Sequence, residues 1–283
     1  MGHVVADIFR QAAQLNRDDP RRQGNVIRLA DAGEMIVAGD LHGNRGNLNK
    51  IIDHASLGRS PQQCLVLQEV IHGPVDPDTG HDRSIELLVR VARLKIQYPQ
   101  QVLTLLGNHD VAQIANNEIT KDGRGVCKEF NAGVRFSYGD AADEISEAMN
   151  EFLLSMPLAA ICPNRVLMAH SLPSPHRMEI AGMEILSRAT ELADLPRGKG
   201  AYEWTWGRNQ TAQQLDDLAE SLDVDFFVLG HKHVPEGCET IASRAMLLAS
   251  DNERGCIVQF TTSEPLTIEN CCDHVRRIIT LGN

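Results

Sequence analysis

Four short apolar runs in this chain each end directly in a cluster of polar residues. The runs are rich in Val, Ile, Leu or Phe, which is typical of buried strands. Rigid strands of an α/β sheet place the loops that follow them at one rim, where functional sites collect. We therefore expect the four clusters to lie together in the folded protein. They occupy residues 39–44, 107–110, 169–171 and 230–233.

Strand-like and helix-like segments alternate along the first half of the chain, and the C-terminal third is rich in strands. Apolar residues keep helical spacing from Ile85 to Ile96, with Ser84 as the expected N-cap. Further helices are expected over residues 145–153 and 209–222, and an accessory helix within residues 1–23. This pattern predicts an α/β fold in which helices flank a mixed sandwich of sheets. Strands are expected at residues 26–29, 35–38, 64–67, 102–106, 166–169, 226–229, 245–248 and 256–260.

Length, charge and composition favour one domain and disfavour several classes of partner. A chain of 283 residues with 42% apolar composition can bury one large core, so we expect residues 1–283 to form a single domain.

A net charge of −11 disfavours binding to nucleic acid or to an anionic membrane. We find neither a signal-peptide pattern nor an apolar stretch long enough to span a bilayer. No nucleic-acid partner, no membrane partner and a cytoplasmic location are therefore expected.

The four polar clusters offer oxygen and imidazole donors and contain no cysteine. This donor set suits borderline divalent ions such as Mn²⁺, Fe²⁺ or Zn²⁺. The chain also lacks the GxSxG turn of serine hydrolases, the GxxxxGK[ST] phosphate loop and the GxGxxG dinucleotide fingerprint. A metal site is therefore a better explanation of the clusters than a nucleophilic serine or a nucleotide-binding loop.

The order of the motifs resembles that of the calcineurin-like metallophosphoesterases. It runs DxH, an acidic residue after a strand, GNHD, a lone His and GHxH, and it looks closest to the phosphoprotein (serine/threonine) phosphatase branch. Residues 84–110, 150–162 and 206–239 resemble that branch beyond the motifs, and the likeness runs from about residue 24 to 260. The resemblance implies the four-layer fold of that family, a mixed β-sandwich flanked by helices.

The resemblance also implies a metal-dependent phosphatase that hydrolyses phosphomonoesters, including phosphoserine and phosphothreonine in proteins. Two divalent ions would activate a water for direct attack on phosphorus, with Mn²⁺ the leading expectation and Fe or Zn the alternatives. The substrate would be a phosphorylated protein or a small phosphoester. One ion would be bound by Asp40, His42 and His233 and the other by Asn108, His170 and His231, with Glu69 as the bridge.

The same resemblance assigns the catalytic proton and the phosphate contacts. His109 would protonate the leaving oxygen, with Asp110 or a nearby group to orient it. The phosphate would be held by Asn108 and by Arg208, with Arg83 as a further candidate that is equally well explained as a solvated residue near a helix start.

One segment departs from the pattern of the family. At residues 68–73 the family has GDxxDRG, whereas this chain has Glu69 in place of the bridging Asp, His72 in place of the second Asp, and no Arg. A Glu carboxylate can still bridge two ions, but its extra methylene requires a local adjustment. Two alternatives therefore stay open: a dinucleoside polyphosphate hydrolase, which the scaffold also supports, and a noncatalytic protein that binds metal or phosphate.

Overall fold

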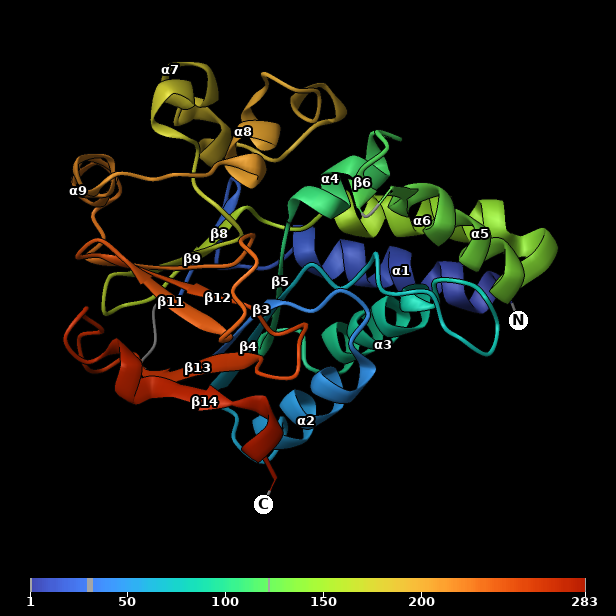
Figure 1. Ribbon diagram of the computed structural model, residues 1–283, viewed down its shortest axis with the longest axis horizontal. Coiled ribbons are helices and arrows are strands. Elements are labelled where there is room, and N and C mark those ends of the chain that lie inside the picture. The colour runs from blue at the N-terminus through green and yellow to red at the C-terminus, as the bar shows by residue number, and fades with distance from the viewer. Residues whose placement is uncertain (1, 30–32, 122, 283) are drawn as a thin grey trace.

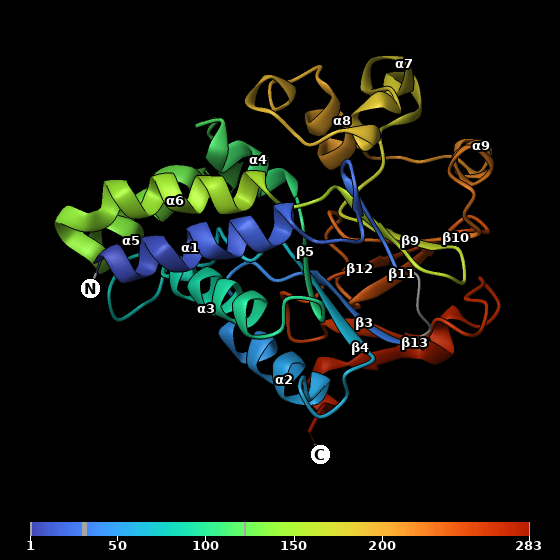
Figure 2. The ribbon, with the colours of Figure 1, turned by 180° about the vertical axis from the view of Figure 1, so that it is seen from behind.

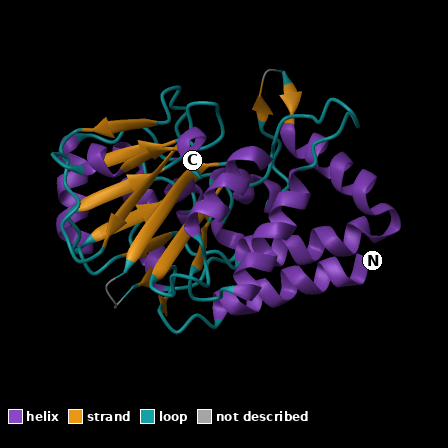
Figure 3. Cartoon of the chain, turned by 90° about the horizontal axis from the view of Figure 1, so that it is seen from below, coloured by secondary structure: helices purple, strands orange, loops and turns teal. Residues whose placement is uncertain are grey.

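The computed structural model describes residues 2–29, 33–121 and 123–282. Two mixed β-sheets form its centre and helices flank them, as the sequence predicts (Figure 1). The seven-stranded sheet runs β1 (Arg22–Gln23), β2 (Val26–Arg28), β8 (Ala159–Ile161), β9 (Val166–Ala169), β10 (Phe226–Leu229), β12 (Ala245–Leu248), β11 (Cys238–Ile241). The five-stranded sheet runs β14 (Val275–Arg277), β13 (Cys256–Thr261), β3 (Glu34–Asp40), β4 (Gln63–Gln68), β5 (Val102–Leu105). A separate hairpin pairs β6 (Thr120–Lys121) with β7 (Arg124–Gly125) and stands apart from both sheets (Figure 3).

The helices lie outside the strands (Figures 2 and 3). Helix α1 (Gly2–Arg17) packs against both α3 (Ser84–Gln97) and α6 (Ala142–Leu154), and stacking of Phe9 on Phe152, with ring centroids 5.8 Å apart, joins α1 to α6. Helices α7 to α9 lie at the other end of the molecule. The helices are α1 (Gly2–Arg17), α2 (Arg45–Ala55), α3 (Ser84–Gln97), α4 (Asn108–Ile114), α5 (Val126–Tyr138), α6 (Ala142–Leu154), α7 (Met178–Ala181), α8 (Gly200–Trp206) and α9 (Ala212–Leu222).

Alternate residues of the central strands face two different hydrophobic layers. On β9, Val166 and Met168 belong to the cluster between the sheets, while Leu167 and Ala169 belong to the cluster under the helices. The strands are therefore covered on both faces, which explains why they read as continuous apolar runs rather than as alternating ones. Among the described residues, no helix is long and apolar enough to cross a membrane.

The strand directions bring the polar clusters together. Strands β3, β4 and β5 are parallel, and so are β9 and β10, so the carboxyl ends within each group meet at one edge. An isolated bridge between Asp40 and Ala249 joins the two sheets at that edge.

All eight predicted strands are present, but two helix starts differ from the prediction. Arg83, not Ser84, is the N-cap of α3, and Asp82 Oδ1 accepts the Ser84 N–H at 2.8 Å. The last predicted helix begins at Ala212 instead of Asn209, because the Thr211 hydroxyl caps it by accepting the Gln214 N–H at 3.2 Å.

Candidate active site

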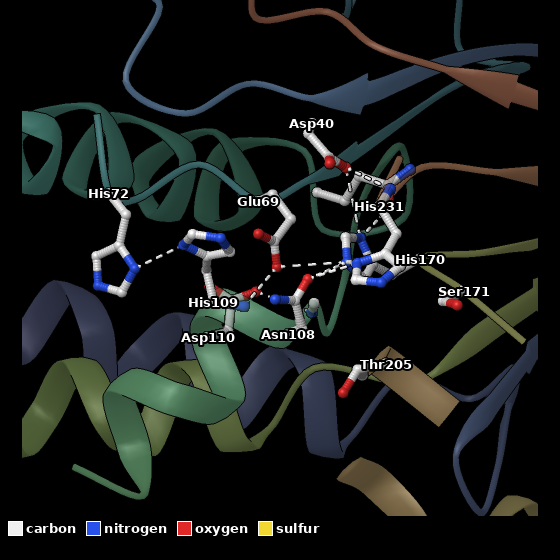
Figure 4. Close-up of polar contacts among 12 residues, drawn as sticks. Asp40, Glu69, His72, Asn108, His109, Asp110, His170, Ser171, Thr205 and His231 are labelled. Atoms are coloured by element: carbon white, nitrogen blue, oxygen red, sulfur yellow. Dashed lines mark hydrogen bonds and ion pairs between the residues drawn. The ribbon is translucent and has the colours of Figure 1, made fainter. Parts of the chain in front are cut away.

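Most of the predicted metal-binding side chains converge at the shared edge of the sheets, where Figure 4 shows Asp40, Glu69, Asn108, His170 and His231, and His42 lies beside Glu69. Each lies at the end of a strand or within three residues of it, so the framework that positions it is rigid. The first turn of α4 adds further side chains, because that helix begins at Asn108, close after β5. Asp40 ends β3, Glu69 follows β4, and His170 and His231 follow β9 and β10.

Asn108, His170 and His231 form the tightest group of donors. Asn108 Oδ1 lies 2.8 Å from His170 Nε2 and 2.7 Å from His231 Nδ1, and the two ring nitrogens are 3.2 Å apart. Donor atoms that share one first-row ion at bond lengths of about 2.0–2.2 Å are separated by roughly 3 Å. Within the part of the chain that the structure describes, His231 Nε2 has no hydrogen-bond partner, and burial holds the pKa of His231 well below its usual value. The imidazole is therefore neutral, which is the form that binds metal.

Glu69 lies between this group and His42. Its Oε1 accepts the His109 backbone N–H at 2.9 Å and lies 3.7 Å from His170 Nε2, while its Oε2 lies 3.9 Å from His42 Nε2. Oε2 is buried and has no hydrogen-bond partner among the described residues. Burial, followed by the negative charges of Asp110 and Asp40, raises the pKa of Glu69 well above its usual value. A cation at this point would remove the cost of burying the carboxylates.

Asp40 adjoins the histidine group, with Oδ1 3.4 Å from His170 Nδ1, whereas His42 lies beside Glu69 Oε2. Asp40 Oδ1 accepts the His231 backbone N–H at 3.1 Å. Burial acts to raise the pKa of Asp40, but His170 and His42 together lower it below the usual value. His42 Nδ1 lies 3.2 Å from the Ile71 carbonyl oxygen, to which it must donate, and Nε2 is the nitrogen that faces Glu69. His233 is exposed and lines the cavity beside Asp40 and His42, at the rim.

Three of these residues have left-handed backbone conformations, which are uncommon outside glycine. The φ angles are 38° at His42, 47° at Glu69 and 69° at His231. Each such angle costs on the order of 1–3 kcal/mol and persists only where the surroundings hold it. The Glu69 carbonyl oxygen accepts N–H bonds from Leu41 at 3.1 Å and His42 at 2.7 Å, which holds the two loops together. Strain therefore concentrates at the residues that point into the site.

His109 and Asp110 have different surroundings. His109 lines the cavity, and its Nδ1 lies 2.9 Å from Nδ1 of His72. Atoms of His109, Glu69 and His42 lie within 4.8 Å of one another, so the predicted proton donor borders the predicted metal site. Asp110 is buried and accepts the Gly107 backbone N–H at 3.0 Å, and burial raises its pKa to about 7. The His109 ring thus contacts both His72 and the His42 ring, whose centroid is 4.6 Å away, and the orienting role of Asp110 stays a prediction.

The two candidate arginines are placed differently. Arg208 lines a cavity of about 340 Å³ together with Asp40, His109 and His231. Its backbone is held in both directions by Ser174, whose hydroxyl accepts the Arg208 N–H at 2.9 Å and donates to its carbonyl oxygen at 2.8 Å. Arg83 instead pairs with Glu86 and is absent from the cavity wall.

Comparison with known proteins identifies this arrangement. The model of the calcineurin-like phosphoesterases matches residues 35–235. The chain belongs to this family. It is 23% identical over 235 residues to a serine/threonine-protein phosphatase of Caenorhabditis elegans, which covers 76% of this chain and 46% of the relative. A putative serine/threonine-protein phosphatase of the same organism is 23% identical over 291 residues, or 95% of this chain and 70% of the relative.

Solved structures share the fold of this phosphoesterase. A protein serine/threonine phosphatase from Saccharomyces cerevisiae, with similarity to human phosphatase PP5, matches with a TM-score of 0.68 at 17% identity over 92% of this chain and 82% of that one. A cold-active protein-tyrosine phosphatase of a Shewanella species matches with a TM-score of 0.61 at 14% identity, covering 87% and 78% of the two chains. This chain spans about half the length of the first curated relative, for which the covered share is 46%.

Sequence reasoning gave no role to two neighbours of His109. His72 was noticeable only as a departure from the family pattern, and it is buried against the His109 ring. Gln113 lies one helical turn after His109 on α4, and its side chain accepts from His72. No sequence signal marks Gln113, because the helix that places it one turn after His109 is not itself predicted from the sequence.

Gly107 makes room for the Glu69 carboxylate of this phosphoesterase. A Cβ at position 107 would lie 1.8 Å from Glu69 Oε1. We expect Gly107→Ala to displace that carboxylate and to weaken metal binding sharply. Gly46→Ala is the matched control, because the nearest atom to its added Cβ is 3.6 Å away, and there we expect unchanged metal binding and a gain of about 0.5–1 kcal/mol in helix stability. Metal titration of both variants checks this, and equal affinities would contradict it.

Proposed function

We propose that this phosphoesterase hydrolyses phosphomonoesters, including phosphoserine and phosphothreonine in proteins, at a site for two divalent metal ions. The observation that carries the proposal is the Glu69 carboxyl group, which is buried between His42 and His170 and whose Oε2 has no hydrogen bond among the described residues. Ionising a buried carboxyl group whose second oxygen lacks a hydrogen bond is costly, and the donors around it are those that bind first-row divalent ions. The family membership supports phosphoester hydrolysis and divalent metal ions in general.

The residues present fit two ions. Asp40, His42 and His233 would hold one ion, Asn108, His170 and His231 the other, and Glu69 would contact both. When bound, two such ions lower the pKa of a shared water and neutralise charge that develops on the phosphoryl oxygens. Mn²⁺ is the metal we expect, with Fe or Zn as alternatives, since this donor set accepts several first-row ions.

The other side chains of the cavity would bind and orient the phosphoester. Arg208 would pair with the phosphoryl oxygens, since a guanidinium fork matches a phosphate. The Asn108 amide oxygen faces His170 and His231, which leaves its amide nitrogen to donate to phosphate. His109 would give a proton to the leaving oxygen as the bond from that oxygen to phosphorus breaks.

Arg208 and Arg83 supply a matched pair for testing the phosphate contact. We expect Arg208→Ala to lower kcat/KM about 10- to 100-fold, because a charge-assisted hydrogen bond contributes roughly 1.5–3 kcal/mol. Arg83→Ala should change kcat/KM by less than about threefold, because it removes a surface ion pair with Glu86. Steady-state kinetics of both variants checks this. A larger loss in Arg83→Ala than in Arg208→Ala would reverse the assignment.

A substrate screen tests the proposed function. Purified protein loaded with Mn²⁺ would be offered phosphoserine and phosphothreonine peptides, an aryl phosphate and a dinucleoside polyphosphate. The proposal predicts turnover of the phosphomonoesters. Preferred cleavage of the dinucleoside polyphosphate would replace the proposed substrate class. Bound metal without turnover of any compound would indicate a noncatalytic binding protein.

A further inference from the structure

Gln68, the last residue of β4, connects two strands and a histidine through its side-chain amide. Its Nε2 donates to the Ala38 carbonyl oxygen of β3 at 3.0 Å, and its Oε1 lies 3.0 Å from His170 Nδ1. The residue is 2% exposed, so both contacts are shielded from water. At this place the family pattern GDxxDRG has Gly, so the amide is a feature of this chain.

The backbone around Gln68 leaves room for its side chain. The register of β3 against β4 shifts between Val37 and Asp40, which places a β-bulge beside Gln68. Bulges are frequent next to active sites, where they redirect a side chain. On the other side lies Gly230, where a Cβ would be 2.7 Å from Gln68 Oε1 and 2.5 Å from Asp40 Oδ1. The amide therefore lies against backbone on both sides, which holds it in one position.

The bond to Ala38 determines which way round the amide lies. In the opposite orientation its oxygen would face the Ala38 carbonyl oxygen, and neither atom could donate. Oε1 therefore faces His170, and because an amide oxygen only accepts, His170 Nδ1 carries hydrogen. Asp40 Oδ1, 3.4 Å from the same nitrogen, is a more distant acceptor. In the neutral form that binds metal, the His170 ring thus has its lone pair on Nε2.

Nε2 is the nitrogen of His170 that faces the other donors of its group, since it lies 2.8 Å from Asn108 Oδ1 and 3.2 Å from His231 Nδ1. We propose that Gln68 is a positioning residue that directs His170 Nε2 at the ion bound by Asn108, His170 and His231. This inference rests on the metal-binding role of His170 in the proposed function. Metal-binding histidines generally donate their second N–H to such an acceptor, and its loss typically costs about 10- to 100-fold in metal affinity.

An uncharged acceptor suits this position. The site already contains the buried carboxyl groups of Asp40, Glu69 and Asp110, and a further buried carboxylate would repel them. The Gln68 amide accepts from His170 without adding charge. Because Gln68 is also the nearer acceptor, the Asp40 carboxylate stays available for the ion that it shares with His42.

Stepwise titration of Mn²⁺ into metal-free variants tests this role of Gln68. Gln68→Met keeps the length of the side chain and removes the acceptor, and we expect it to weaken one of the two binding steps about 10- to 100-fold and the other much less. Gln63→Met is the matched control, since Gln63 is buried at the other end of β4 and donates to Glu34 Oε2 at 3.1 Å. It should lower Tm but leave both binding steps unchanged.

A second substitution and thermal melts separate positioning from a purely structural role. Gln68→Glu restores an acceptor for His170 and should recover most of the affinity lost in Gln68→Met. A purely structural role would lower the Tm of Gln68→Met in chelator and leave both binding steps as in the wild type. That result would overturn this inference alone, whereas a wild-type protein that binds no divalent ion would defeat the proposed function as well.

Long-range ¹H–¹⁵N correlation spectra of the wild-type protein, labelled in histidine and loaded with diamagnetic Zn²⁺, locate the proton without any substitution. We expect His170 with the ion on Nε2 and hydrogen on Nδ1. An ion on Nδ1 of His170 would overturn the proposal. Neither measurement depends on turnover, so a protein that gives both expected results and hydrolyses no phosphoester would contradict the proposed hydrolysis and support the role of Gln68.

Discussion

Replacement of His109 by Ala is expected to lower kcat for alkyl phosphates roughly 10²- to 10⁴-fold, the usual contribution of a general acid. The ring lines the cavity and borders Glu69 and His42, but it is not among the predicted metal ligands, and its removal leaves those ligands in place. We therefore expect metal content to stay close to that of the wild type. Steady-state kinetics and elemental analysis on the same sample measure both quantities.

The leaving group and a second histidine provide the controls for His109→Ala. The loss in kcat should be smaller for a nitrophenyl phosphate, because a good leaving group departs with little protonation. His81→Ala should leave kcat nearly unchanged, since His81 stacks on Phe136 and does not line the cavity. A His109→Ala variant with full activity and bound metal would remove the proton-donor role. Loss of metal would instead make His109 a ligand.

The second large effect is expected for Glu69→Gln, which should lower metal affinity by several orders of magnitude and reduce turnover accordingly. The substitution keeps the shape but removes the negative charge between the two groups of donors, so the repulsion between two cations is less well offset. Isothermal titration with Mn²⁺ measures the change. Wild-type affinity in Glu69→Gln would show that the bridge lies elsewhere.

Without metal, Glu69→Gln should be more stable than the wild-type protein, although it binds metal more weakly. The pKa of Glu69 is raised by burial, then by Asp110 and Asp40, so the folded metal-free protein holds a proton that the unfolded chain releases. Its stability should therefore fall as pH rises from the usual Glu pKa of 4.5 through the raised value. Glu69→Gln removes this dependence, and we expect a higher Tm without metal near pH 7 and a smaller rise in Tm when metal is added. Thermal melts in chelator and in Mn²⁺ distinguish the two contributions.

The strands and most of the site could be predicted because each polar cluster directly follows an apolar run. Asp40, His170 and His231 are at strand ends, and strand direction alone brings strand ends together. Glu69 belongs to none of the four clusters and was assigned from the place of the family's bridging Asp after a strand, and it does follow β4 directly. His233 shows the limit of the rule, because two residues beyond His231 it reaches the rim and not the centre of the site.

Sequence patterns did not predict helices α4 and α5, and the reason differs between the two. Helix α4 begins inside the GNHD motif, so polar site residues occupy its first turn and no apolar stripe marks it. Helix α5 contains Gly133, which disfavours a helix in a peptide. Here the missing side chain is required, because a Cβ at position 133 would lie 1.7 Å from the Asp82 carbonyl oxygen.

The contacts of His72 were beyond sequence reasoning for the same reason. They depend on Phe130 and Asn131 of α5, a helix that sequence patterns did not predict. The two arginines show the same limit of sequence patterns. Arg83 and Arg208 are both close to motifs in the sequence, and the fold is needed to tell that Arg208 lines the cavity whereas Arg83 pairs with Glu86.

Titration of Mn²⁺ into metal-free protein, with bound metal and phosphomonoester turnover measured on the same samples, tests the dinuclear site most directly. We expect about two ions per chain and turnover that appears only as the sites fill. Full turnover in the presence of chelator, or no binding of Mn²⁺, Fe²⁺ or Zn²⁺ at saturating concentration, would contradict a metal-dependent site built on Glu69.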